Sequence, residues 1–314
     1  RVQQQLQYVK EARAEGARLI PHVGARPVNI LMGWEGTVNP FMFHQSYAPL
    51  AGLEPEERLA QLRDPAVRRA IVDEVPPHLN HEIMDKIVDG FDNIYVLAEN
   101  PDYEPGAEDS IQRLAQRAGV TPAEFAYDAL MQGDGKRMLY CPLFGYDKRN
   151  LDRQMEMLAD ENSVISLADT GAHCGVLSDA SIPTWLLSYL VRDREHGVRF
   201  SLEQAVSMHT LETARCMGLT DRGTLQAGMK ADINIIDLEH LAIATPQVIY
   251  DLPAGGRRVY QGATGYRYTL VSGEVIMQDG EPSGALPGRL IRAGRGDGSH
   301  APEQTPTHNK EEAA

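Results

Sequence analysis

The stretch that decides the fold is "NSVISLADTGAHCGVLSDAS", residues 162–181. An apolar run leads to Asp169 and then breaks into Thr-Gly-Ala-His-Cys-Gly. This pattern predicts a strand that ends on a carboxylate, and parallel α/β folds place catalytic groups there because the strand-to-helix loops open at that end. Taken alone, Asp169 is equally consistent with a cap of the following turn.

The residues after Asp169 favour a ligand-binding loop. Gly171 and Gly175 would let the backbone approach a ligand closely, and His173 could face the same cavity. A single loop histidine is nevertheless more often structural or exposed than catalytic. Cys174 is not expected to act with His173, because adjacent residues on an extended segment point to opposite sides.

The segments before this stretch repeat an order of helix, turn, strand and loop. An amphipathic helix to about Gly16 is followed by a strand, "ARLIPHV", and by the loop "GARPVN". This order is typical of an α/β protein with parallel strands. Arg26 and His22 lie at the end of that strand. There an arginine could clamp a substrate carboxylate, and a salt bridge is an equal alternative.

Two further regions depart from this order. Residues 29–140 form an ordered interruption, in which Asp64 with Pro65, and Thr121 with Glu124, predict helix starts. Ser201 with Gln204 predicts another. After Gly218 the chain becomes strand-rich, with a hairpin expected at Ser272-Gly273. The last segment, 293–314, is polar and rich in Gly and Pro, so we expect disorder there.

The composition of the chain argues against a nucleic-acid or membrane partner. The 314 residues are 42% hydrophobic with a net charge of -14, and the basic residues are scattered, which argues against nucleic acid. No apolar run reaches the roughly 18 to 20 residues that cross a bilayer, so no membrane partner is expected. Three cysteines without metal-like spacing indicate a reducing compartment, and we expect a cytoplasmic protein.

The segments "LADTGAHCGVLSDAS", "GTLQAGMKADINIIDL" and "GYRYTLVSGEVIMQDGEPSGALPGRLIR" resemble the amidohydrolase superfamily, and within it the N-acyl-D-amino-acid deacylases, or D-aminoacylases. The resemblance implies an α/β fold, a (β/α)8 barrel with a small β-sandwich. Residues 1–218 would then be the C-terminal part of the barrel with a helical lid inserted at about 29–140. Residues 219–292 would be the sandwich, and 293–314 the tail.

The resemblance also implies a chemistry. A metal, usually zinc, activates water to hydrolyse the N-acyl amide bond of an N-acyl-D-amino acid. Asp169, at the end of the eighth barrel strand, would bind the metal and carry the proton from water to the leaving amine. His173 would contact the substrate or its oxyanion. Arg26 and His22, on the seventh strand, would line the substrate pocket.

One departure from the family is large. The His-x-His pair of the first barrel strand, and the histidines of the fifth and sixth, have no counterpart here. The chain also opens without Met. We therefore expect the C-terminal portion of a longer enzyme, inactive alone, or a divergent copy. The strand in "KADINIIDL" would then lack neighbours, and its free edge would favour homo-oligomers or aggregation.

Two alternatives stay open. One is a cyclic amide hydrolase similar to dihydroorotases and hydantoinases, with the same chemistry on another substrate. The other is a non-catalytic fragment that serves binding or assembly. A reading frame upstream that encodes a His-x-His would exclude the second alternative.

Overall fold

The computed structural model describes residues 2–146, 148–168, 171 and 173–291. Its centre is a pair of parallel strands, β1 (His22–Gly24) and β5 (Val164–Ser166), in the register His22 to Val164 and Gly24 to Ser166. The predicted parallel arrangement of these two strands is confirmed. Strand β1 is shorter than "ARLIPHV" because Pro21 has no N–H, although its carbonyl accepts a hydrogen bond from Val164 N at 2.9 Å.

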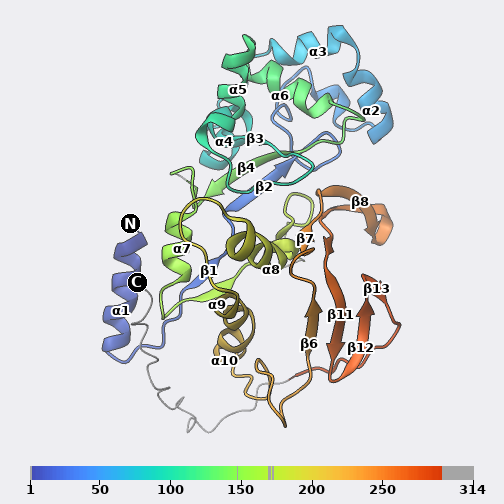
Figure 1. The fold of residues 1–314 in the computed structure, drawn as a ribbon. Helices are drawn as coiled ribbons and strands as arrows, with labels where there is room; N and C mark the ends of the chain where they lie inside the picture. The colour runs from blue at the N-terminus through green and yellow to red at the C-terminus, as the bar shows by residue number, and fades with distance from the viewer. Residues whose placement is uncertain (1, 147, 169–170, 172, 292–314) are drawn as a thin grey trace.

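Helices surround this pair (Figure 1). The capping box predicted at Ser201 and Gln204 is present, and it starts a helix that passes through one π-helical turn. In chain order the helices are α1 (Val2–Ala14), α7 (Asp152–Leu158), α8 (Ile182–Trp185) with the π-helical η5 (Leu186–Asp193), α9 (Leu202–Ser207), the π-helical η6 (Met208–Glu212) and α10 (Thr213–Cys216). Among the described residues no third strand joins β1 and β5, so closure of the predicted barrel is not confirmed.

The interruption in the α/β order contains a sheet of its own as well as helices. Strands β2 (Val28–Met32), β4 (Leu139–Phe144) and β3 (Tyr95–Val96) form an antiparallel sheet in that order. The helices lie above it in Figure 1. They are α2 (Pro55–Leu62), α3 (Pro65–Val72), α4 (Glu82–Asp89), α5 (Ile111–Ala118) and α6 (Pro122–Met131). The insertion therefore combines the expected helices with a sheet that forms its root.

The predicted helix starts in this insertion follow from local hydrogen bonds. Asp64 Oδ1 accepts from Ala66 N at 2.7 Å, and Thr121 Oγ1 accepts from Glu124 N at 3.1 Å. The Glu124 carboxylate, in contrast, pairs with Arg68 at 2.9 Å. Thr121 is thus the predicted N-cap, while Glu124 stabilises a contact between α3 and α6.

The three-stranded sheet separates two hydrophobic cores. Side chains on a strand alternate between its faces. Leu31 and Tyr140 therefore pack in the barrel-side core, with Trp185, Leu190 and Val259. Their neighbours in sequence turn the other way, into the insertion core, whose members include Met32, Leu139, Trp34, Leu62 and Ile87. The sheet is a wall common to both cores.

The C-terminal region is built from antiparallel strands. The hairpin turn at Ser272 and Gly273 has φ values of 54° and 83°, as a two-residue turn requires. Its sheet has the order β13 (Glu281–Pro282), β12 (Glu274–Gln278), β11 (Tyr266–Val271), β6 (Ile233–Ile236). Two ribbons pair β7 (Ala242–Ile243) with β10 (Ala263–Thr264), and β8 (Gln247–Leu252) with β9 (Gly256–Tyr260). In this C-terminal region the described residues form one four-stranded sheet and two two-stranded ribbons, so the predicted sandwich is not confirmed.

Strand β6 lies at the edge of its sheet. Within the described residues it pairs only with β11, and Ile235 on it is 49% exposed. The free edge expected in "KADINIIDL" is present in the structure. No helix in the described part of the chain is long and apolar enough to cross a membrane.

Candidate active site

Strand β5 stops before the predicted carboxylate. Leu167 has a φ of 62°, in the left-handed region, which ends the strand after Ser166. A Cβ on Gly24 would lie 2.8 Å from Leu167 Cδ1, so a larger residue at this position of β1 would have to displace the exposed Leu167 side chain. Asp169 lies outside the described residues, together with Thr170 and Ala172. Its proposed role stays a prediction.

The loop that follows is held from two sides. Thr37 N and Leu31 N, both in the insertion, donate to the carbonyls of Gly175 and Val176 at 3.4 and 2.9 Å. Val259 N, on β9, donates to the Cys174 carbonyl at 2.7 Å. The insertion and the C-terminal region thus both fix the backbone of the loop that carries His173.

His173 is exposed and has a φ of 48°. Its carbonyl accepts hydrogen bonds from Val176 N at 2.9 Å and Leu177 N at 3.1 Å, which stabilises this conformation. The backbone is therefore ordered while the imidazole faces solvent. A ligand contact by His173 is compatible with this placement and stays a prediction.

Arg26, the predicted substrate clamp, is buried and contacts protein groups. Its side chain has no exposed surface. Its guanidinium donates to Ser181 Oγ and to the Ser178 carbonyl, each at 3.1 Å, lies 3.6 Å from Asp179, and stacks on the Tyr103 ring at 4.0 Å. The salt bridge, the alternative left open by the sequence, is what the structure contains. Arg26 anchors the 178–181 turn to the end of β1.

His22 lies at the other end of β1 from Arg26. It is the first residue of β1, whereas Arg26 follows the last residue of that strand. The two side chains therefore belong to opposite ends of the strand. His22 is exposed at the end away from the loop of His173, and its contact with a substrate stays a prediction.

Two residues that the sequence pattern did not indicate complete the Arg26 cluster. The Gln261 side-chain oxygen accepts from Ser181 Oγ at 2.5 Å and from Tyr103 OH at 3.1 Å, while its amide nitrogen donates to the Ala244 carbonyl at 2.8 Å. Burial raises the pKa of Asp179, although Arg26 opposes the effect. Four distant parts of the chain meet in this cluster, and no local sequence motif indicates that Tyr103 or Gln261 belongs to it.

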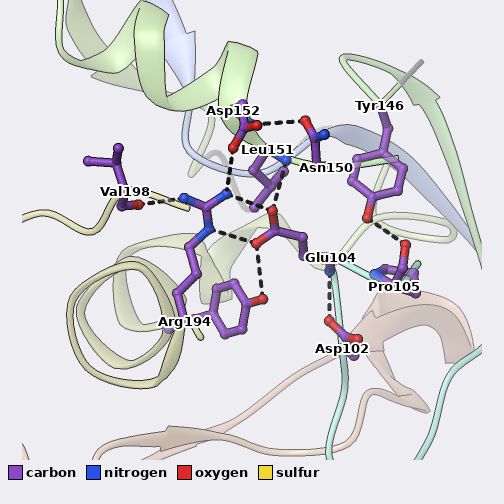
Figure 2. A network of polar contacts seen from close by, with 10 residues as sticks. Asp102, Glu104, Pro105, Tyr146, Asn150, Leu151, Asp152, Arg194 and Val198 are labelled. Atoms are coloured by element: carbon purple, nitrogen blue, oxygen red, sulfur yellow. Dashed lines mark hydrogen bonds and ion pairs between the residues drawn. The ribbon is translucent and has the colours of Figure 1, made fainter. Parts of the chain in front are cut away.

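A second polar cluster joins the insertion to the end of η5 (Figure 2). Arg194 donates through Nε and Nη2 to the two carboxylate oxygens of Glu104 at 2.8 and 2.7 Å. Leu151 N and Tyr189 OH donate to the same carboxylate at 2.9 and 3.0 Å. Arg194 also contacts Asp152 at 3.2 Å. Arg194 thus forms its ion pair at the C-terminal end of η5.

The described residues do not fit a metal ion. No group of three or more His, Cys, Asp or Glu side chains among them is placed to bind one. The predicted metal ligand, Asp169, lies outside these residues. We therefore derive no catalytic step through a metal from this geometry.

Several known proteins are similar to this chain. It is 33% identical to an s-triazine hydrolase of Gordonia rubripertincta over 137 residues, which are 43% of this chain and 23% of that protein. It is 33% identical to a dihydroorotase of Lactobacillus acidophilus over 115 residues, 35% of this chain and 25% of the relative. The chain thus spans about a quarter of the length of these curated relatives.

Two solved structures are also similar. A crystal structure of D-aminoacylase is 18% identical in sequence to this chain. The match covers 79% of this chain and 46% of the D-aminoacylase chain, with a TM-score of 0.37. An N-acyl-D-glutamate deacylase from Bordetella bronchiseptica, in complex with zinc and a phosphonate inhibitor, is 21% identical. That match covers 61% of this chain and 37% of the deacylase chain, with a TM-score of 0.31.

A family model decides the relationship. The model described as "Amidohydrolase family" matches residues 3–277, which include both the insertion and most of the C-terminal strands. The resemblance noted in the sequence is confirmed at this level. The chain belongs to the amidohydrolase family.

Proposed function

We propose that this chain is the C-terminal portion of a metal-dependent hydrolase that cleaves the N-acyl amide bond of N-acyl-D-amino acids. The observation that carries the proposal is the run Asp169-Thr-Gly-Ala-His173, which follows β5 in a chain of the amidohydrolase family. Such a position, beyond the C-terminal end of a parallel strand, suits a group that meets substrate. The sequence resemblance to D-aminoacylases supplies the substrate class.

Each residue has one proposed task. Asp169 takes a proton from the attacking water and gives it to the leaving amine nitrogen. His173 contacts the substrate or its developing oxyanion from the exposed loop. Arg26 touches no substrate and holds the turn at 178–181 in place. Zinc, when bound, would polarise the amide carbonyl and activate water, with most of its ligands supplied from outside this chain.

A second candidate is a cyclic amide hydrolase. The 33% identity to a dihydroorotase over 115 residues favours it. Both candidates use the same proton transfer at Asp169, and they differ in whether the amide is linear or closed in a ring. Substrate assays therefore separate them.

The test uses the full-length protein supplied with zinc. We expect hydrolysis of N-acetyl-D-amino acids in preference to their L forms, dihydroorotate and hydantoin. Asp169→Asn should lower kcat by about 10²- to 10⁴-fold, the usual contribution of a proton-transfer group. The exposed Asp279→Asn is the matched control and should keep full activity.

Three outcomes would contradict the proposal. Turnover of hydantoin or dihydroorotate without any N-acyl-D-amino acid would favour the cyclic amide hydrolase. Full turnover by Asp169→Asn would remove the role given to that residue. Absence of hydrolysis of every substrate by the zinc-supplied protein would favour the non-catalytic alternative.

A further inference from the structure

A cavity of about 470 Å³ lies apart from the Arg26 cluster and the loop of His173. It lies between the C-terminal end of β4 and the turn from α4 into η2 (Phe91–Asn93). No lining residue belongs to the 173–181 segment. Its volume is in the range of small-molecule sites, which is about 300 to 1,000 Å³.

One wall of the cavity is apolar. Pro142, Leu143 and Phe144 of β4 form it, and the Phe144 ring is half exposed. Lys86 Nζ lies 5.5 Å from the centre of that ring, so its ammonium group is held at the edge of the apolar wall. A ligand on this wall would therefore have a positive charge beside it.

Four carbonyl oxygens of the cavity lining accept hydrogen bonds from donors within the protein. The Lys86 and Gly90 carbonyls accept from Gly90 N and Asn93 N at 3.2 and 2.8 Å. Pro142 O accepts from Asn93 Nδ2 at 2.9 Å, and Tyr146 O accepts from Arg149 N at 3.1 Å. These four carbonyls are thus less available to a ligand that donates hydrogen bonds, and the Asp92 carboxylate, also in the lining, accepts from Arg149.

The charged donors of the cavity are only partly used. An arginine has five N–H groups, and contacts of Arg149 within the described part of the chain are to Asp92 at 2.8 Å and to Tyr95 OH at 3.3 Å. Lys86 contacts Glu82 at 2.8 Å. The carboxylates of Glu82 and Asp92 are 76% and 62% exposed, and such ion pairs are weak. An anion in the cavity could therefore attract both cations.

We propose that this cavity binds a small organic carboxylate whose apolar body lies on the Phe144 wall. The carboxylate accepts hydrogen bonds from Lys86 and Arg149, and the body covers Pro142 and Leu143. The partly used donors, the four occupied carbonyls and the apolar wall together favour this class over amines or neutral amides. The proposal is independent of the proposed deacylase activity.

Isothermal titration calorimetry with the full-length protein tests this site, with benzoate as the probe. Benzamide has the same ring without the charge, and acetate has the charge without the ring. We expect saturable binding of benzoate, and binding at least about tenfold weaker for each of the other two, which corresponds to one missing interaction of about 1.4 kcal/mol.

Variants place the binding in this cavity. Lys86→Gln and Arg149→Gln should each weaken benzoate binding by about fivefold to tenfold, the scale of one charged hydrogen bond in a half-exposed site. Lys136→Gln is the matched control, because Lys136 is an exposed lysine that lies 3.8 Å from Glu35 and outside the cavity. It should leave binding unchanged.

Three results would overturn the proposed carboxylate site. No saturable benzoate binding, equal affinity for benzamide, or unchanged binding by Lys86→Gln would each overturn the proposal. Thermal melting checks that each variant folds. If Arg149→Gln does not fold because its contacts to Asp92 and Tyr95 are lost, Lys86→Gln and the benzamide comparison still decide.

Discussion

Arg26 brings a full positive charge into a part of the molecule without exposed surface. Buried charges are tolerated when partners surround them, and Ser178, Asp179, Ser181 and Tyr103 contact the guanidinium here, while Arg26 Nε has no hydrogen-bond partner among the described residues. A residue type suited to binding a substrate carboxylate thus serves the stability of the turn after the predicted site.

Replacement of Arg26 should show this structural role. Arg26→Met removes one member of a buried ion pair, so we expect the free energy of unfolding to fall by about 3 kcal/mol. Urea denaturation measures it, with the exposed Arg113→Met as control. A decrease in the free energy of unfolding below about 1 kcal/mol, together with an increase in KM of the full-length enzyme, would instead support a role of Arg26 in binding substrate.

His209, on η6, should make the stability of the protein depend on pH. Burial lowers its pKa from 6.5 to about 4, against the opposing effect of the Pro183 carbonyl. Between these values the unfolded chain binds a proton that the folded chain does not, so stability is present above pH 6.5 and is lost as the pH falls toward 4. The loss at pH 4.5 should be roughly 2.5 kcal/mol at about 1.4 kcal/mol per pKa unit.

The variant His209→Gln isolates this effect. It cannot be protonated, and we expect its urea midpoint to change less between pH 7 and pH 4.5 than that of the parent chain. The exposed His196→Gln should retain the parent slope. Equal slopes for His209→Gln and the parent chain would show that other groups cause the acid sensitivity.

Elements are connected by contacts between residues far apart in sequence. Arg194 and Glu104 join the end of η5 to the insertion, with side chains that are 1% and 7% exposed (Figure 2). Glu104→Gln and Arg194→Met should each cost about 3 to 5 kcal/mol, because each leaves a buried charge without its partner. The double variant should cost less than the two together.

A double-mutant cycle in urea measures that coupling. Asp279→Asn is the control, because its pair with Arg267 at 3.4 Å is exposed and should contribute less than about 0.5 kcal/mol. Additive losses from Glu104→Gln and Arg194→Met would mean that the two side chains act separately.

The local elements could be predicted from sequence, and the long-range contacts could not. Asp64, Thr121 and Ser201 start helices as predicted because an N-cap depends on a few neighbouring residues. The Tyr103–Gln261 hydrogen bond spans 158 positions, and no pattern in either neighbourhood requires it. The sequence predicts that Arg26 follows β1, as it does. Its burial depends on Tyr103 and the 178–181 turn, which lie far away in sequence.

At the scale of the molecule, the sheet of β2, β4 and β3 should make the two cores unfold together. Leu31 and Leu139 are fully buried on its opposite faces. Leu31→Ala and Leu139→Ala should therefore shift the same transition, and each should lower the free energy of unfolding by about 2 to 5 kcal/mol. Hydrogen exchange should show equal protection of β2 and β4 amides.

Separate transitions would contradict this expectation. If the helices α2 to α6 lost protection at lower urea than β1 and α8, the insertion would be an independent unit. The exposed Val75→Ala, between α3 and α4, should leave the midpoint unchanged and serves as the control.

The common sheet also limits how this protein can be recombined with its relatives. Excision of residues 29–140 would remove Leu31, Tyr95 and Tyr140 from the barrel-side core, and a transplanted insertion would carry those side chains into a foreign core. The exchangeable unit is therefore smaller than the insertion. Chimeras should retain β2, β3 and β4 from the recipient and exchange only the helical segments between them.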